Sequence, residues 1–284
     1  MSDVRPITRH ISYYPILPIE GLHVIHLFYR VERQAWNDVD SEERVKRRRV
    51  FTRLVAEIQA HPNTQLLSFS MVTPKADLGF MLVTPDLQFA DRCTKRLGEG
   101  LGQGILSPVF SWLSLTERSE YTTGEEEYGA SLVVEENLEK GSEAYEEKMT
   151  AFRDRMAKYL MDRLEPNLPP LNDWPVFCFY PMSKRRNPDQ NWYEQSFEER
   201  KRLMAGHARI GRTYAGRVRQ LITGSTGLDD MEWGVTLFAK STSEIKSIVY
   251  EMRFDEVSNR YAEFGRFFIG IQMKIPNLCN RLNL

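Results

Sequence analysis

The sequence lacks several features that would assign a function directly. Its three cysteines, Cys93, Cys178 and Cys279, lie far apart and form no CxxC pair. An odd number of separated cysteines predicts reduced thiols in a cytosolic setting, not a disulfide framework. The five histidines form neither an HExxH motif nor a Cys/His zinc pattern, which argues against a bare metal ion held by the protein alone.

Long apolar runs and an excess of charge are missing as well. No stretch approaches the roughly eighteen apolar residues of a membrane helix, and Met1–Pro15 has no apolar core of a signal peptide. We therefore expect a cytoplasmic protein without a membrane partner. A formal net charge of −1 over 284 residues gives no global attraction for nucleic acid. Any site for an anion must be a local cluster of cations.

The first part of the chain contains a regular alternation of strand and helix patterns. Leu22–Val31 is apolar and rich in β-forming residues, which predicts a strand. Asp40–Gln59 carries apolar residues at helical spacing. Two strands are expected at Gln65–Thr73 and Leu78–Val83, followed by a helix near Asp86–Leu97. This β-α-β-β-α order is typical of a ferredoxin-like half.

The middle of the chain differs in composition from the parts on either side. Residues 117–140 are acidic and rich in glycine and threonine, so we expect a partly exposed connector with a strand near Ser131–Val134. A helix is predicted from about Ser142 to Leu164. The proline-rich stretch Glu165–Pro175 ends this helix, because proline lacks the backbone N–H that a helix needs.

The last part of the chain repeats the order of the first. Trp174–Tyr180 is expected to be a strand that Pro181 ends. The long helix NWYEQSFEERKRLMAGHARIGRTYAG follows, with Ser196 and Glu199 as a capping box. Further elements are predicted at Leu221–Thr223 and Glu232–Phe238 (strands), Ser243–Arg253 (helix) and Phe264–Met273 (final strand). We predict an α+β fold in which residues 1–165 and 166–284 form two halves that pair into one barrel.

One histidine of the long helix has neighbours at helical spacing. The residues that share its face are Leu203, His207, Ile210, Tyr214 and Val218. His207 is then either a core histidine satisfied by a carbonyl or carboxylate, or an axial ligand to a metal or haem. Gly206 and Gly211 favour the second interpretation, because small residues let a flat group lie close to a helix. A lone histidine suits iron in a porphyrin, since the macrocycle supplies the other four donors.

A second candidate site is the segment Phe179–Arg186, FYPMSKRR. Tyr180 ends the predicted strand, and its phenol is either half-buried with its hydroxyl in water or a donor of protons and electrons. The run Lys184, Arg185 and Arg186 is either a solvated turn or a site for carboxylates. A phenol, several cations and one imidazole together fit a metallated macrocycle that bears carboxylates.

These residues lie in motifs that resemble a known family. In chain order the motifs are RLEPNLP, FYPMSKRR, NWY, ERxxLMxxHxxxGRxYxG, VxQ, GSxGLDDxEWxVTLF and IVYEMRFDExSxRYxEFG. They resemble the coproheme decarboxylases, the hydrogen-peroxide-dependent branch of the chlorite dismutase-like superfamily. The resemblance is dense from about Trp174 to Gly270. It implies a dimeric α+β barrel of two ferredoxin-like halves, with iron in the C-terminal half and assembly as a homopentamer.

The resemblance also implies roles for individual residues. His207 would be the proximal iron ligand, Tyr180 the radical-forming phenol and Lys184 a second catalytic residue near the reacting groups. The residues implied in binding the macrocycle and its propionates are Arg163, Tyr180, Pro181, Met182, Ser183, Lys184, Gln220, Arg253 and Ser258. Gln220 takes the distal position, where chlorite dismutases have an arginine. Arg219 is adjacent, but the VRQ register matches the glutamine and disfavours chlorite chemistry.

The implied reaction is the oxidative decarboxylation of coproheme, Fe-coproporphyrin III, to protohaem. Hydrogen peroxide would oxidise Tyr180 through the iron, and the phenoxyl would take a hydrogen atom from propionates 2 and 4 in turn, leaving vinyl groups. Coproheme would be both substrate and cofactor, and a ferrochelatase would supply it. The alternatives are another haem-dependent peroxidase, a chlorite-degrading enzyme, or a non-catalytic haem carrier on the same fold.

Overall fold

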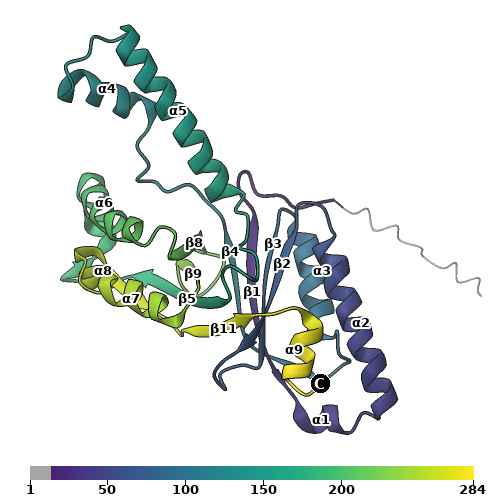
Figure 1. Cartoon of the computed structure of the whole chain (residues 1–284). Helices are drawn as coiled ribbons and strands as arrows, with labels where there is room; N and C mark the ends of the chain where they lie inside the picture. The colour runs from purple at the N-terminus through teal and green to yellow at the C-terminus, as the bar shows by residue number, and fades with distance from the viewer. Residues whose placement is uncertain (1–13) are drawn as a thin grey trace, which may run out of the picture.

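The first half of the chain folds into four strands and their covering helices, in the ferredoxin-like order. The elements are β1 (His23–Val31), α1 (Arg33–Asn37), α2 (Ser41–Gln59), β2 (Gln65–Met71), β3 (Leu78–Thr84), α3 (Leu87–Gly98) and β4 (Leu106–Leu115). The computed structural model describes residues 14–284 (Figure 1). Most of Met1–Pro15, the stretch considered as an export signal, therefore lies outside the described residues. The expected elements between residues 22 and 97 are confirmed to within a few residues at each end.

Strand β4 was not predicted, and its sequence explains why. LSPVFSWLSL contains a proline, which normally argues against a strand inside a sheet. The pairing of β4 with β1 shifts register between Phe28 and Tyr29, whose partners are Phe110 and Pro108. Pro108 thus lies at a β-bulge, where the ladder is interrupted and its missing N–H is tolerated.

The second half repeats the order with additional short elements. It comprises β5 (Val176–Lys184), β6 (Arg186–Asn187), β7 (Gln190–Asn191), the 3₁₀ turn η1 (Trp192–Glu194), α6 (Phe197–Thr213), β8 (Val218–Gly224), β9 (Trp233–Ala239), α7 (Thr242–Met252), α8 (Glu256–Tyr261), β10 (Ala262–Phe264), β11 (Phe268–Gln272) and α9 (Ile275–Arg281). The final helix α9 crosses back to pack on α2 of the first half (Figure 1).

The two halves close into one antiparallel barrel. The sheet order is β10-β5-β11-β2-β3-β1-β4-β8-β9, and β9 pairs again with β5. Within each half this is the ferredoxin-like strand order. Three residue pairs join β11 to β2, whereas only Leu115 and Gly224 pair between β4 and β8. The predicted α+β fold of two ferredoxin-like halves is therefore confirmed.

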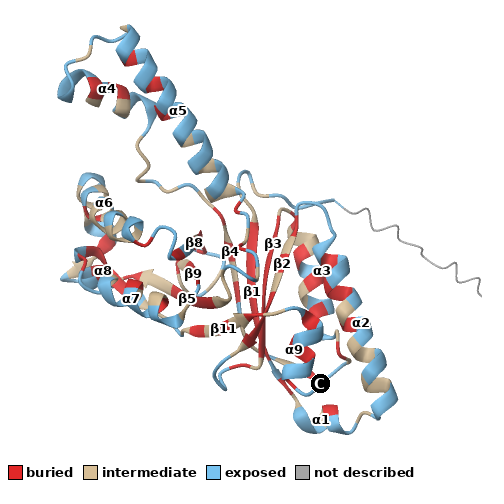
Figure 2. Ribbon diagram, in the orientation of Figure 1, coloured by how far each residue is buried: buried red, intermediate tan, exposed pale blue. Residues whose placement is uncertain are grey.

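The barrel has an aromatic interior and two outer faces covered by helices. Alternate residues of the strands point inward, where Phe28, Phe69, Phe177 and Phe179 form part of one buried cluster. Figure 2 shows that buried residues are concentrated in the strands of the barrel. On the outer face of the first half, α2, α3 and α9 pack a hydrophobic core onto β1–β4. On the outer face of the second half, α6 and α7 cover a separate cluster.

The middle of the chain forms a helical arm that extends away from the barrel (Figure 1). It consists of α4 (Glu125–Glu135) and α5 (Glu143–Leu164), which begins after its N-cap Ser142 as predicted. The expected strand at Ser131–Val134 is wrong, because these residues belong to α4. Helix is favoured there by contacts with α5: Leu132 is buried, and the Tyr128 ring stacks on Phe152 at 4.2 Å.

Three boundaries in the second half also differ from the predictions. The long helix begins at Phe197, after the separate turn η1, and Val218 lies in β8, so it does not share a helix face with His207. The final strand is split into β10 and β11. Strand β5 does not end at Pro181 but continues to Lys184.

Pro181 is tolerated in β5 because of the gap between β10 and β11. Its carbonyl accepts a hydrogen bond from Gly265 N (2.8 Å), within the connection between those two strands, so the ladder needs no N–H at this point. A Cβ at Gly265 would lie 2.6 Å from the Pro181 ring. Glycine is therefore required for this close approach. Within residues 14–284, no helix is long and apolar enough to cross a membrane.

Candidate functional site

The outer face of the second half collects most of the predicted site residues. Because side chains alternate along β5, Phe177 and Phe179 enter the barrel interior while Cys178 and Tyr180 face the helices. Met182 lies on the same helix-facing side. The strand thus presents one side of the FYPMSKRR segment to the space below α6 and α7.

Helix α6 carries His207 above this face without packing tightly on the sheet. Ser196 caps its first turn, accepting a hydrogen bond from Glu199 N at 3.2 Å. Within the described residues, α6 makes its main contacts with α7 and α8, not with a strand. Leu203 is the one fully buried residue of the helix. The position of α6 is thus set more by its neighbouring helices than by the strands.

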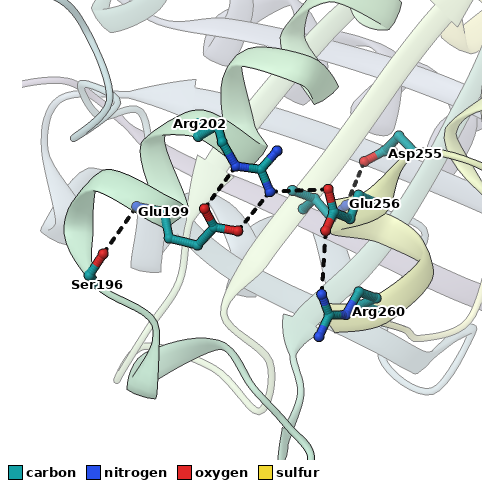
Figure 3. Close-up of polar contacts among 7 residues, drawn as sticks. Ser196, Glu199, Arg202, Asp255, Glu256 and Arg260 are labelled. Carbon is teal, nitrogen blue, oxygen red and sulfur yellow. Dashed lines mark hydrogen bonds and ion pairs between the residues drawn. The ribbon is translucent and has the colours of Figure 1, made fainter.

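An ion-pair network ties α6 to α8 (Figure 3). The Arg202 guanidinium contacts the Glu199 carboxylate at 2.7 Å and the Glu256 carboxylate at 3.2 Å. Glu256 also pairs with Arg260 at 3.3 Å. Single exposed pairs contribute little to stability. Together, however, these ion pairs hold α8 beside α6 and so place Asp255, the N-cap of α8, opposite His207.

His207 is held by a buried carboxylate. Its Nδ1 lies 3.0 Å from Asp255 Oδ2, and the Ser258 hydroxyl lies 3.5 Å from the same nitrogen. Asp255 is the N-cap of α8, and its other oxygen accepts hydrogen bonds from Val257 N and Ser258 N at 2.9 and 3.1 Å. One carboxylate therefore both starts a helix and orients the imidazole.

The ionisation of Asp255 determines which nitrogen of His207 is available. Burial alone would raise the pKa of Asp255, but the hydrogen bonds from His207 and Ser258 outweigh it and lower that pKa. An ionised Asp255 accepts a hydrogen bond from Nδ1–H of His207, and in that tautomer the lone pair of Nε2 is the one that can bind a metal. The His207 side chain keeps 32% of its surface exposed, so this nitrogen remains accessible.

A pocket of about 520 Å³ opens beside this group. It is lined by Arg185, Arg253, Ser258, Asn259, Ala262, Glu263, Phe264, Gly265 and Phe267. A second, apolar pocket of about 370 Å³ under α7 shares Arg253 and Phe267 with it. Ser258 connects the first pocket to His207, since its hydroxyl faces the imidazole.

Tyr180 lies on the other side of the aromatic residues that line the pocket. Its ring stacks on Phe267 with centroids 4.3 Å apart and contacts Phe264 at 5.8 Å. Burial raises the pKa of the Tyr180 phenol well above its usual range, although the Arg253 charge opposes this rise. The phenol is therefore protonated throughout the neutral pH range. Phe264 and Phe267 connect it to the pocket.

Three cations surround the site. Among residues 14–284, no salt bridge forms to Lys184, Arg185 or Arg253. The Lys184 ammonium is buried and lies 4.4 Å from the centre of the Trp192 ring. Burial lowers its pKa to about 8, against the attraction of Asp255 and Glu232. The Arg253 guanidinium lies 3.8 Å from the centre of the Phe264 ring.

The two residues of the VRQ register point to different places. Gln220 Nε2 donates to the carbonyl of Gly211, one turn beyond His207, at 3.3 Å. Arg219 instead donates to the carbonyl of Asn167 at 2.8 Å. A Cβ added at Gly211 would lie 3.4 Å from the Gln220 amide nitrogen, whereas a Cβ added at Gly206 would meet no atom within 4 Å. The glutamine, not the arginine, therefore faces α6.

Arg163 lies apart from the other predicted residues. It is in the last turn of α5, and its Nε donates to the carbonyl of Glu117 at 2.8 Å. None of its described contacts reaches His207 or Tyr180. Of the predicted residues, Ser258 and Arg253 line the pocket. His207 and Tyr180 do not line it but contact residues that do, Ser258 and Phe267 respectively. Arg163 lies at the base of the arm.

Two residues of this site were missed from the sequence. Asp255 was given no role from the sequence, but its side chain contacts His207 at 3.0 Å. Its position before a short helix was the available signal, since aspartate is a preferred N-cap. Glu232 carried no assigned role, although it is buried and contacts the backbone of Lys184 at 2.7 Å.

A barrel of two ferredoxin-like halves, with a lone histidine beside a pocket lined by cations, defines the class of this protein. The family model described as chlorite dismutase matches residues 36–273. The chain belongs to the chlorite dismutase family.

Solved structures agree with this assignment. The chain is 33% identical to a heme-binding protein from Thermus thermophilus, covering 96% of this chain and 100% of that one, with a TM-score of 0.76. It shares its fold with chlorite dismutase from Candidatus Nitrospira defluvii in complex with imidazole (16% identity, 94% and 97% coverage, TM-score 0.67). A mutant of the same enzyme gives 17% identity, 94% and 98% coverage and a TM-score of 0.67.

Proposed function

We propose that this protein binds coproheme in its C-terminal half, residues 166–284, and decarboxylates it to protohaem with hydrogen peroxide. The observation that carries the proposal is the position of His207. Its helix is held away from the sheet, its Nδ1 bonds Asp255 at 3.0 Å, and its Nε2 is left to ligate iron. The heme-binding relative from Thermus thermophilus supports haem as the class of ligand.

The residues around the pocket fit a flat iron complex that carries carboxylates. Among residues 14–284, no group of three or more His, Cys, Asp or Glu side chains could hold a bare metal ion. A single imidazole suffices for a porphyrin iron. Lys184, Arg185 and Arg253, which lack carboxylate partners in the described chain, are suited to propionates.

The bound iron complex would supply peroxide reduction and the oxidation of a nearby phenol. Tyr180 would then act as the hydrogen-atom acceptor, with Lys184 near the reacting propionate. For each propionate, one peroxide and one proton are consumed, and one carbon dioxide, two waters and a vinyl group are formed. Because its raised pKa keeps the phenol protonated, Tyr180 can lose an electron and a proton together. Asp255 keeps the imidazole oriented.

The direction of Gln220 separates this proposal from chlorite degradation. Gln220 faces α6 and would lie on the iron side of β8, whereas Arg219 is engaged with Asn167. An uncharged distal residue suits peroxide better than it would hold a chlorite anion. Homopentamer assembly, the supply of coproheme by a ferrochelatase and the propionate-binding role of Arg163 belong to the same proposal.

The decisive experiment adds peroxide stepwise to the coproheme-loaded protein and weighs the tetrapyrrole by mass spectrometry. We expect two successive losses of one formic-acid equivalent. Tyr180→Phe should abolish both losses while iron stays bound, because the variant keeps His207 but lacks the oxidisable hydroxyl. Turnover by Tyr180→Phe at the wild-type rate would refute the mechanism.

The alternatives predict different results in the same preparation. A chlorite-degrading enzyme would release oxygen rapidly from chlorite, which can be followed with an oxygen electrode. A haem carrier would bind coproheme and show no mass loss with peroxide. A protein that binds no tetrapyrrole would give no Soret change during coproheme titration.

A further inference from the structure

Glu232 is a buried carboxylate to which no role in the proposed reaction has been given. Its side chain is 5% exposed and lies just before β9, in the loop that follows β8. Burying a carboxylate is costly unless donors satisfy it. Glu232 has three donors: Oε2 accepts from Lys184 N (2.7 Å), and Oε1 accepts from the Tyr193 hydroxyl (2.5 Å) and from the Arg186 guanidinium.

All three donors come from one stretch of chain, residues 184–193. This stretch leaves the end of β5, turns through the small β6–β7 hairpin and returns through η1. Its return places the Trp192 ring over the Lys184 ammonium at 4.4 Å. Within the stretch itself, one further backbone bond runs from Trp192 N to the carbonyl of Arg185 (3.0 Å).

The backbone of Glu232 is anchored on both sides, so the carboxylate is a fixed point. Glu232 N donates to the carbonyl of Met182 at 3.0 Å, and Ser225 N donates to the carbonyl of Glu232 at 2.7 Å. The anchor is the β5–β9 pairing and the β8–β9 loop. Residues 184–193 are held by this carboxylate and also by the end of α8, since Arg185 N donates to the carbonyl of Tyr261 at 2.7 Å and the Trp192 ring contacts the Tyr261 ring. The carboxylate therefore ties both ends of the stretch, Lys184 and Tyr193, to the residue before β9.

We propose that Glu232 is a positioning residue that holds residues 184–193 closed and so presents the Lys184 ammonium, beneath Trp192, to a carboxylate of the ligand. The inference rests on the proposed function only in taking a carboxylated tetrapyrrole as that ligand. The negative charge of Glu232 also favours the ammonium form of Lys184 against the effect of burial.

The test uses Glu232→Gln, which keeps the shape but not the acceptor pattern. An amide offers one oxygen, so either Lys184 N or the Tyr193 and Arg186 pair would face an NH₂ group. Glu251→Gln is the matched control, because Glu251 also accepts from a tyrosine hydroxyl, that of Tyr214 at 2.6 Å, but has no described contact with Lys184.

The first measurement is hydrogen exchange in the protein without ligand. We expect the Lys184 amide and its neighbours through Tyr193 to exchange at least about tenfold faster in Glu232→Gln, since the acceptor of that amide is compromised. Glu251→Gln should leave this stretch unchanged. Unchanged exchange in Glu232→Gln would overturn the positioning role, whatever the protein does with coproheme.

The second measurement is coproheme affinity in a double-mutant cycle. Glu232→Gln and Lys184→Met should each weaken binding by about tenfold, and the double variant should be no weaker than Lys184→Met alone. Additive losses would mean that Glu232 acts independently of Lys184 and would overturn the inference. If the wild-type protein binds no coproheme, the proposed function fails while the exchange result still decides the role of Glu232.

A milder variant guards against misfolding. Tyr193→Phe removes one donor from a half-exposed ring and leaves the buried carboxylate with two. It should change the exchange of residues 184–193 in the same direction as Glu232→Gln, by a smaller factor. No change in Tyr193→Phe, together with an unfolded Glu232→Gln, would assign Glu232 to stability alone and overturn the proposal.

Discussion

The two halves of the barrel share one topology but use their outer faces differently. In the first half, α2 and α3 pack directly on the strands through a continuous hydrophobic core that includes Phe51, Leu78 and Phe80. In the second half, α7 packs on β8 and β9, but α6 makes its main contacts with other helices. The pocket of about 520 Å³, with Arg185 and Arg253 in its lining, lies on this second face.

The comparison shows how a duplicated architecture separates stability from binding. A face filled with side chains has no room for a ligand, and a helix packed on a sheet cannot present an imidazole to one. The first half therefore contributes packing, while the second keeps a helix at a distance and fixes it through Arg202, Glu256 and Asp255. Three predictions could break or sharpen this contrast.

The largest difference is expected in unfolding free energy when one phenylalanine on the outer face of each half is truncated to alanine. Phe51 is fully buried in the first-half core, so Phe51→Ala should cost about 3–5 kcal/mol of unfolding free energy. Phe264 already borders the pocket, and Phe264→Ala should cost under about 1.5 kcal/mol, because the cavity exists beforehand. Urea unfolding of the ligand-free protein measures both. Equal costs would show that the second face is a packed core like the first.

The next largest effect is expected on ligand binding, when one histidine is removed from each half in turn. His207→Ala should weaken coproheme binding by about 100-fold or more, equivalent to about 2.7 kcal/mol, and change the Soret band, because the proximal donor is lost. Added imidazole should restore the spectrum. His23→Ala, which removes a ring bonded to the Pro85 carbonyl at 3.1 Å in the first half, should leave binding intact. An unchanged Soret band in His207→Ala would place the iron ligand elsewhere.

The smallest expected effect concerns the interior that both halves share. His26 is fully buried against Phe179 at 4.0 Å, and burial lowers its pKa to about 3. Between about pH 6.5 and pH 3 the unfolded chain binds a proton at this residue while the folded protein does not. Stability should therefore fall with decreasing pH, by about 1.4 kcal/mol per unit from this group.

A variant without this histidine isolates its share of the pH dependence. Urea unfolding of the wild-type protein and His26→Asn from pH 6.5 to 4.5 should give a steeper decline for the wild type. Parallel curves of unfolding free energy against pH would show that His26 is protonated in the folded barrel, which would contradict its burial among apolar residues.

The sequence predicted the elements whose patterns agree with their surroundings. The helix over residues 41–59 and the first three strands have clear periodicity and short loops, so local preference and packing coincide. Ser131–Val134 reads as strand because of its β-branched residues, yet the stacking of Tyr128 on Phe152 favours a helix there. The prediction that Pro181 ends its strand was wrong, because the gap between β10 and β11 removes the need for an N–H there. Pro108 is tolerated in β4 for a related reason, since it lies at a bulge.

The candidate site was predictable only in part, because its contacts join distant segments. His207 and Ser258 were identified from motifs, but the 3.0 Å contact between His207 and Asp255 spans 48 positions and leaves no trace in local pattern. Glu232 is likewise separated from Lys184 by 48 positions. Arg163 stays a prediction, since its guanidinium contacts the arm base and not the pocket.

The loop Gly224–Asp230 does more than reverse the chain direction, because its side chains also help to join β8 to β4. Where strand pairing stops after one residue pair, Leu113 N donates to the Asp229 carboxylate at 2.9 Å and its carbonyl accepts from the Ser225 hydroxyl at 2.6 Å. Side-chain hydrogen bonds thus join β4 to the loop after β8 where backbone pairing is missing. Besides the Thr223–Ser114 hydrogen bond, closure of the barrel at this point uses the side chains of two loop residues, Ser225 and Asp229. A turn of equal length but other composition would therefore lose two of the contacts that join β4 to β8.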